Sequence, residues 1–356
     1  MVMDGRVWHA ASAGFEAARR LVQVPPSHRA RNLHGHGFQA RVRGELPAGW
    51  AEFPGGEVQR LQAELREVTG MLDYRLLNEV LTEPSDERLA RWIAAQLPLP
   101  LEVALQSRPD RGVDLDAEGR AHAWRRHAFH SAHRLPNVPE GHKCGRMHGH
   151  GFEVLIHAQG VDHDAIDDGW APLQAQLHHV CLNDLPGLEN PTSEMLSSWI
   201  WERLQPALPT LAHVTVFETA SCGACYDGRR WRTWKEFSLD SALCLRRAPE
   251  SSPLRRLHGH TYTLRLHLEA PLDALMGWTL DFGDVKRLFD PVFRALDHQP
   301  LHEIESLTDC DPASLAHWAL GQARERLPQV DRVDLFETPA CGATVQLGAA
   351  TPALPV

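Results

Sequence analysis

The sequence predicts an α+β protein made of three tandem units, each with the element order ββααββ and with helices packed on an antiparallel sheet. The triplet His-Gly-His occurs three times in the 356-residue chain and begins at residues 34, 148 and 258. This spacing is near the common size of a domain, which favours three units of one kind. We expect the units to span residues 1–120, 121–230 and 231–356.

Two strands are expected to open each unit. About twenty residues before each triplet lie corresponding segments that begin with Phe, at residues 15–19, 129–133 and 237–243. After each triplet, apolar and polar residues alternate, at residues 38–42, 152–156 and 262–266. Such alternation is typical of a strand with one buried face, and we expect the two strands to be antiparallel neighbours.

Two helices are expected to follow the strands. The first is amphipathic, most clearly at residues 58–65 and 284–289. Asn190 and Asp311 stand where the N-caps of the second helix belong. Proline suits the first turn of a helix, and the second helices are expected to open near Pro84, Pro191 and Pro312.

The remaining landmarks also recur in each unit. The second helix carries a tryptophan on the face that we expect to be buried, at Trp92, Trp199 and Trp318. A β-rich segment then closes the unit, at residues 101–105, 214–218 and 333–337. The junctions between units are expected in the polar stretches 116–125 and 226–234.

Composition limits the classes of partner. Hydrophobic residues make up 43% and charged residues 23%, as in soluble domains with real cores. A net charge of −10 argues against nucleic acid or an anionic membrane as a general partner, and an anionic substrate would need a local basic pocket. We find no apolar run of bilayer length and no signal-peptide core near the first residue. Seven cysteines without framework spacing favour a reducing cytoplasm.

The middle triplet predicts a metal site. Residues i and i+2 of a strand point to the same side, so His148 and His150 project together. His133, on the neighbouring strand, supplies a third imidazole. Three nitrogen ligands and an open position are typical of catalytic zinc. The alternative is a pair of histidines hydrogen-bonded on a polar sheet face. Because Arg19 and Leu243 replace His133 in the other units, we expect one well-occupied zinc per chain.

Cys144 is the candidate catalytic base. It lies in a glycine-bounded loop, residues 141–146, next to the expected metal. Nearby cations lower the pKa of a thiol, and a thiolate beside a Lewis acid can take a proton from an acidified carbon. The alternative is a small loop residue without chemistry. Unit one has Ala30 and unit three has Leu254 at this position, so neither supplies the same base.

A proton relay would need a partner for Cys144, and a histidine oriented by a carboxylate is the usual one. Unit three offers Asp297 and His298, whereas the aligned residues are 73–74 (Asp-Tyr) in unit one and 178–179 (His-His) in unit two. The cysteine and the Asp-His dyad are thus complete in different units, which favours a site shared between units two and three. The alternative is a surface pair.

The segment 133–150, HRLPNVPEGHKCGRMHGH, resembles the zinc-and-cysteine signature of 6-carboxytetrahydropterin synthases, which belong to the queuosine pathway and are relatives of 6-pyruvoyltetrahydropterin synthases. The resemblance continues through residues 188–194 and 217–219, and it is weaker in units one and three. It implies the tunnelling fold, in which three units form a twelve-stranded antiparallel barrel ringed by helices. Two barrels stack in this family, so we expect a homodimer of single-chain pseudo-trimers.

The resemblance also implies chemistry. The substrate would be 7,8-dihydroneopterin triphosphate and the product 6-carboxytetrahydropterin, formed with loss of triphosphate and acetaldehyde. The alternatives are a 6-pyruvoyltetrahydropterin synthase and a pterin-binding scaffold without turnover. The implied zinc ligands are His133, His148 and His150, and the implied proton-transfer groups are Cys144, Asp297 and His298. The implied pterin anchor is Glu218 or Glu337, at the position where we align Gln106 of unit one.

Overall fold

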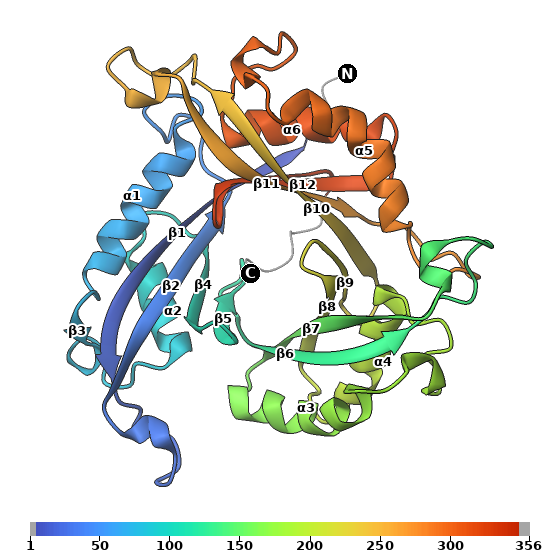
Figure 1. Cartoon of the computed structure of the whole chain (residues 1–356). Helices are drawn as coiled ribbons and strands as arrows, with labels where there is room; N and C mark the ends of the chain where they lie inside the picture. The colour runs from blue at the N-terminus through green and yellow to red at the C-terminus, as the bar shows by residue number, and fades with distance from the viewer. Residues whose placement is uncertain (1–4, 349–356) are drawn as a thin grey trace.

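The computed structural model describes residues 5–348, and the three units repeat one succession of elements in it (Figure 1). Unit one contains β1 (Arg6–Arg19), β2 (His34–Gly44), α1 (Glu57–Gly70), α2 (Asp86–Gln96), β4 (Glu102–Arg108) and β5 (Arg111–Leu115). Unit two contains β6 (Ala121–His133), β7 (His148–Gln159), α3 (His163–Leu177), α4 (Ser193–Leu204), β8 (Leu211–Thr219) and β9 (Cys222–Tyr226). Unit three contains β10 (Trp231–Leu243), β11 (His258–Leu268), α5 (Phe282–Leu296), α6 (Pro312–Arg324), β12 (Val330–Thr338) and β13 (Cys341–Gln346).

Short elements occupy the connections. A 3₁₀ turn precedes each triplet, at η1 (Arg29–Arg31), η3 (Lys143–Gly145) and η5 (Pro253–Arg255). Another lies between the two helices of each unit, at η2 (Leu77–Glu79), η4 (Leu182–Asp184) and η6 (Leu301–Glu303). The two-residue strand β3 (Arg75–Leu76) pairs in parallel with β1. The recurrence of these turns supports the alignment of the three units.

The long strands close into one barrel. Apart from β3, neighbouring strands pair antiparallel from β1 through β13, and β13 pairs back with β1. Closure leaves no long strand with a free edge, which gives three fused units a physical reason to stay together. The six α-helices of residues 5–348 ring the outside of the barrel in Figure 1. The predicted α+β fold, a single-chain pseudo-trimer, is confirmed.

Each unit has its own hydrophobic core between the helix pair and the outer face of the barrel. In unit two, Phe152 and Ile156 of β7 pack with Trp170 of α3 and Ile200 of α4. The predicted tryptophan position is fully buried only there: Trp199 is buried, whereas the tryptophans of the other two units, Trp92 and Trp318, are partly buried. No helix of the described chain is long and apolar enough to cross a bilayer.

The N-cap prediction is right for Asp311 and wrong for Asn190. The carboxylate of Asp311 accepts a hydrogen bond from the backbone N–H of Ser314, as an N-cap does. In unit two the cap is Thr192, whose hydroxyl accepts from the N–H of Met195. Because Thr192 is still extended, α4 begins two residues later than expected. The Asn190 amide instead donates to the carbonyl of Met276 in unit three.

The junctions between units are tight turns in a continuous sheet. Residues 116–120 form the turn between β5 and β6, closed by the N–H of Gly119 on the carbonyl of Asp116. The predicted junction 116–125 is therefore too long. Arg125 already lies in β6. A charged residue is accommodated in this strand because its guanidinium pairs with Asp110 and Asp167. The second junction is the turn 227–230 between β9 and β10.

Candidate metal centre at the boundary of units two and three

Strand pairing brings the three predicted histidines of unit two together. His133, at the end of β6, lies directly opposite His148 of β7, and His150 lies opposite Ser131. One ligand atom each from His133, His148, His150 and Glu218 lie within 4.8 Å of one another. His148 and His150 point to the same face of β7 as Phe152, which packs in the core beneath the helices. The set therefore faces the helices, on the opposite side of the sheet from the barrel lumen.

The hydrogen bonds of these rings leave the metal-binding nitrogens free. Nδ1 of His133 lies 3.1 Å from the carbonyl of Pro191, and Nδ1 of His148 lies 2.8 Å from the carbonyl of Arg146. A carbonyl only accepts, so Nδ1 carries the proton and Nε2 keeps a lone pair. Nε2 of His133 and of His150 is buried without a hydrogen-bond partner. Burial lowers the pKa of both rings, which favours the neutral form that binds metal.

These residues fit a divalent metal of the zinc type. Two buried imidazole nitrogens that make no hydrogen bond are costly unless something binds them. Imidazole nitrogens suit zinc, and the neighbouring carbonyl acceptors supply the outer hydrogen bonds that orient metal-bound histidines. His133, His148 and His150 would hold the ion.

Glu218, at the end of β8, lies at the edge of this cluster. Its Oε1 is 3.5 Å from Nε2 of His150, and its Oε2 accepts a hydrogen bond of 2.7 Å from the hydroxyl of Ser193. Ser193 is the first residue of α4, so the helix start fixes the carboxylate. Glu218 can therefore face both the ion and a molecule bound beside it.

Cys144 lies in η3 and is partly buried. Burial raises the pKa of its thiol, and the carboxylates of Glu218 and Asp281 raise it further, while Lys143 lowers it. The expectation that nearby side chains lower this pKa is therefore wrong for the protein groups alone, because burial and two carboxylates outweigh one lysine. A metal cation beside the thiol acts in the opposite direction.

Unit three covers this centre with the segment 272–281, which precedes α5. The carbonyl of Gly277 accepts from the hydroxyl of Thr192 at 2.6 Å, and the N–H of Thr279 donates to Oε1 of Glu194 at 2.8 Å. Asp281, the N-cap of α5, lies 3.5 Å from Nε2 of His142 in the cysteine loop. The centre therefore lies at the boundary of units two and three.

Glu194 is a buried acid that the sequence analysis did not single out as a site residue. It is 2% exposed at the start of α4, and burial raises its pKa to about 7 despite the hydrogen bond from Thr279. One signal in the sequence pointed to this contact. The segment after β11 is longer than its counterpart after β7, so it can reach the neighbouring unit, where Thr279 meets Glu194.

The Asp297–His298 dyad forms, but away from Cys144. Oδ2 of Asp297 lies 2.9 Å from Nδ1 of His298, whose side chain is 75% exposed, and Oδ1 accepts from the N–H of Asp240. Asp281 and Asp297 cap opposite ends of α5. The helix has 15 residues, so about 22 Å separates its ends at 1.5 Å per residue. Within one chain, no hydrogen bond or ion pair of the described residues joins the dyad to the cysteine loop.

The alignment of the dyad is supported by the backbone. Tyr74, His179 and His298 all have positive φ, at 53°, 61° and 55°. Each of their N–H groups donates to the equivalent carbonyl of the unit's first strand. The three residues are therefore structural equivalents, and unit two keeps the histidine of the dyad but not its aspartate.

Strand register corrects the predicted counterpart of Glu218 in unit one. Gln39 pairs with Gln106 as Glu153 pairs with Phe217, so Gln106 is the counterpart of Phe217. The residue equivalent to Glu218 is the next one, Ser107. The sequence offered no landmark there, because the Phe-Glu-Thr run is absent from unit one.

Glu337, the second candidate anchor, lies at a different boundary. It accepts a hydrogen bond of 3.1 Å from Gln59 of unit one and lies 3.9 Å from Nε2 of His260. Burial, with Asp311, raises its pKa to about 7. The buried Leu243 stands where unit two has His133. Glu218, not Glu337, is therefore the carboxylate beside the three histidines.

Comparison with known proteins agrees with the repeat. The family model described as 6-pyruvoyl tetrahydropterin synthase matches residues 10–109, 122–229 and 232–347. A 6-carboxy-5,6,7,8-tetrahydropterin synthase of Synechocystis sp. is 35% identical over 118 residues, which cover 29% of this chain and 90% of that protein. A dihydroneopterin monophosphate aldolase of Pyrococcus furiosus is 31% identical over 84 residues, covering 23% of this chain and 70% of that protein.

Among solved structures, the 6-pyruvoyl tetrahydropterin synthase of Caenorhabditis elegans is similar to this chain with a TM-score of 0.31 and 18% identity. The match covers 33% of this chain and 95% of that one. The three family matches together span most of the sequence. The chain therefore belongs to the 6-pyruvoyl tetrahydropterin synthase family, as an enzyme of the lyase type that carries three family units in one polypeptide.

Proposed function

We propose that this protein converts 7,8-dihydroneopterin triphosphate to 6-carboxytetrahydropterin at one zinc centre per chain, in the pathway to queuosine and related 7-deazapurines. The observation that carries the proposal is that the Nε2 atoms of His133 and His150 are both buried and make no hydrogen bond. Cys144 completes the set, which occurs in unit two alone. The 35% identity to a 6-carboxytetrahydropterin synthase favours that branch.

The side chains of the centre have separate tasks in this proposal. His133, His148 and His150 hold zinc, which when bound supplies a Lewis acid for the oxygens of the substrate side chain. Glu218 accepts N–H donors from the edge of the pterin, with Ser193 fixing the carboxylate through a hydrogen bond of 2.7 Å. Cys144, as a thiolate, takes a proton from the substrate side chain.

We propose further that the dyad serves the centre of a second chain. Asp297 keeps His298 oriented through a bond of 2.9 Å, and the exposed ring can donate or accept a proton at Nε2. The length of α5 between the dyad and the cysteine loop supports a site completed by another chain. Because Cys144 and the dyad lie apart within one chain, this proposal requires a homodimer of barrels, in which the dyad of one chain meets Cys144 of the other. The cytoplasm, where cysteines stay reduced, fits the seven free thiols.

The test is turnover of 7,8-dihydroneopterin triphosphate by the zinc-loaded protein, with products identified by mass and Cys144→Ala as the control. A 6-carboxy product that disappears in the control supports the proposal. A 6-pyruvoyl product would assign the other branch of the family. Tight pterin binding without any product would identify a scaffold and refute the proposed activity.

A further inference from the structure

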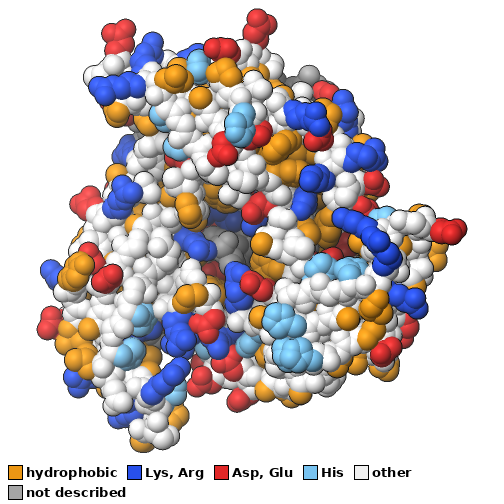
Figure 2. Space-filling view, in the orientation of Figure 1, with side chains coloured by type: hydrophobic (Ala, Val, Ile, Leu, Met, Phe, Trp, Pro, Cys, Tyr) orange, Lys and Arg blue, Asp and Glu red, His pale blue; other side chains and the backbone are white. Residues whose placement is uncertain are grey.

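The barrel lumen holds a cavity of about 780 Å³ on the side of the sheet opposite the metal centre. Its mouth opens at the centre of the face in Figure 2, where Lys and Arg side chains border the hollow. Phe217 lines this cavity, whereas Glu218, the next residue of the same strand, points to the metal centre. Successive strand residues face opposite sides, so the sheet separates the two sites.

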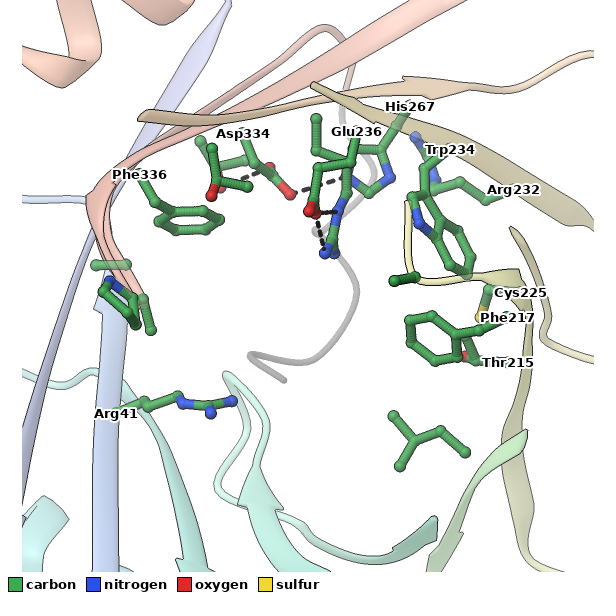
Figure 3. A pocket seen from close by; sticks show the side chains of 18 of the residues that line it. Arg41, Thr215, Phe217, Cys225, Arg232, Trp234, Glu236, His267, Asp334 and Phe336 are labelled. Carbon is green, nitrogen blue, oxygen red and sulfur yellow. Dashed lines mark hydrogen bonds and ion pairs between the residues drawn. The ribbon is translucent and has the colours of Figure 1, made fainter. Parts of the chain in front are cut away.

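Arginines dominate the charged lining of the cavity. Six of them line it, and all but one make an ion pair: Arg43 with Glu102, Arg126 with Glu153, Arg232 with Asp331, Arg265 with Glu236 and Arg332 with Asp334. The exception is Arg41 of β2. It projects into the cavity in Figure 3, and no carboxylate of residues 5–348 pairs with it.

Arg41 is poorly satisfied. Its guanidinium donates one hydrogen bond of 3.1 Å to the amide oxygen of Gln106, and its Nε is buried without a partner. Burial lowers its pKa; the charge of Asp114 opposes this shift, and the charge of Arg126 adds to it by a smaller amount. Asp114 is itself held by Trp124 and His157. A buried guanidinium that forms no ion pair is costly, which makes it a place for an anion.

Unit three shows what unit one lacks. Arg265 is the counterpart of Arg41, because it follows Tyr262 at the same interval as Arg41 follows Phe38. Arg265 has a carboxylate on both neighbouring strands, Glu236 on one side and Asp334 on the other. Arg41 has Ser12 and Ala104 at the two equivalent places. The same cation thus has a carboxylate at both directly paired positions in unit three and at neither of them in unit one.

We propose that the barrel lumen binds a small oxyanion, a phosphate or a carboxylate, on Arg41. Arg126 is the second cation at this place: its charge acts on Arg41, and its own Nε is buried without a partner. Two N–H groups from different guanidinium ions suit the oxygens of one anion. The site is independent of the proposed pterin chemistry, because none of the metal-centre residues lines the cavity.

The experiment restores the missing acid. Ser12→Glu places a carboxylate opposite Arg41, as Glu236 lies opposite Arg265. Thermal unfolding of the full chain is measured with inorganic phosphate or acetate, against chloride at constant ionic strength. We expect phosphate or acetate at ten times its dissociation constant to raise the wild-type Tm by about 2 °C. We expect Ser12→Glu to lose this rise and to have a higher Tm in chloride.

Arg41→Gln should lose the rise as well. Arg6→Gln, which removes an exposed arginine paired with Glu45, should keep it. Phosphate active alone would mark a phosphoryl group, and acetate active alone a carboxylate. An equal response in wild type and in Ser12→Glu would overturn the proposal, because the anion would then bind elsewhere. A wild type that responds to neither anion would overturn it too.

Discussion

Arg19 places a guanidinium nitrogen 3.4 Å from Nε2 of His36 in unit one. The strand register makes Arg19 the counterpart of His133 and His36 the counterpart of His150. A second nitrogen of Arg19 lies 2.7 Å from the buried carboxylate of Asp86. Unit one therefore carries a fixed cation and its counter-ion where unit two gathers three imidazoles.

We expect Arg19→Leu to destabilise the protein by about 3–5 kcal/mol, because it leaves Asp86 buried without its partner. Burial would raise the pKa of Asp86, but Arg19, His163 and Ser107 bring it to about 2, so the group is charged at neutral pH. Denaturant unfolding measures the loss. Arg6→Leu breaks an exposed pair with Glu45 and should cost less than about 1 kcal/mol. Equal small losses in both variants would contradict a stabilising role for Arg19.

Glu218→Gln separates the two tasks open to that carboxylate. If Glu218 anchors substrate, the variant keeps one zinc per chain and loses about 3 kcal/mol of binding to the pterin edge, roughly a 100-fold fall in kcat/KM. Ser193 can still donate to the amide oxygen. Metal analysis and steady-state kinetics on the same sample decide the matter. Loss of zinc would identify Glu218 as a ligand.

Mixing two inactive variants tests whether the dyad acts between chains. Cys144→Ala and His298→Ala should each abolish turnover. When the two chains are unfolded and refolded together, half of the dimers contain one of each, and one of their two centres has both groups intact. We therefore expect the mixture to regain about a quarter of wild-type activity. Activity that stays at zero, with mixed dimers shown by mass, would mean that both groups act within one chain.

Glu194 should make stability fall as pH rises. Its pKa in the folded protein is about 7, above the ordinary value of 4.5, so the folded state binds the proton more tightly. Stability is then greatest below about pH 4.5 for this group and declines up to about pH 7, by roughly 3 kcal/mol in total. Glu194→Gln removes this decline. Glu202→Gln, on the exposed face of the same helix, should not alter it.

Much of the fold could be predicted from the sequence because its signals are local. The triplets, the alternating strands and the amphipathic helices all follow from spacing along the chain. The cluster of His133, His148 and His150 also follows, since two strands joined by one loop pair next to each other.

Other features depend on register and on distance between units. A shift of one residue along a strand moves a side chain to the other face of the sheet. Whether Gln106 or Ser107 is the counterpart of Glu218 is therefore decided only by the strand pairing. The contact of the segment 272–281 with Thr192 and Glu194 joins two units and has no local pattern. The separation of the dyad from Cys144 depends on where α5 lies on the barrel, which periodicity does not encode.

The central claim is that one of three triplets carries the metal and the chemistry. The most direct measurement is metal content and turnover in two variants, one with His148 and His150 replaced by Ala, the other with all four histidines of the triplets in units one and three replaced. We expect the second variant to keep one zinc per chain and its turnover, and the first to lose both. Zinc and turnover that survive in the first variant would contradict the account.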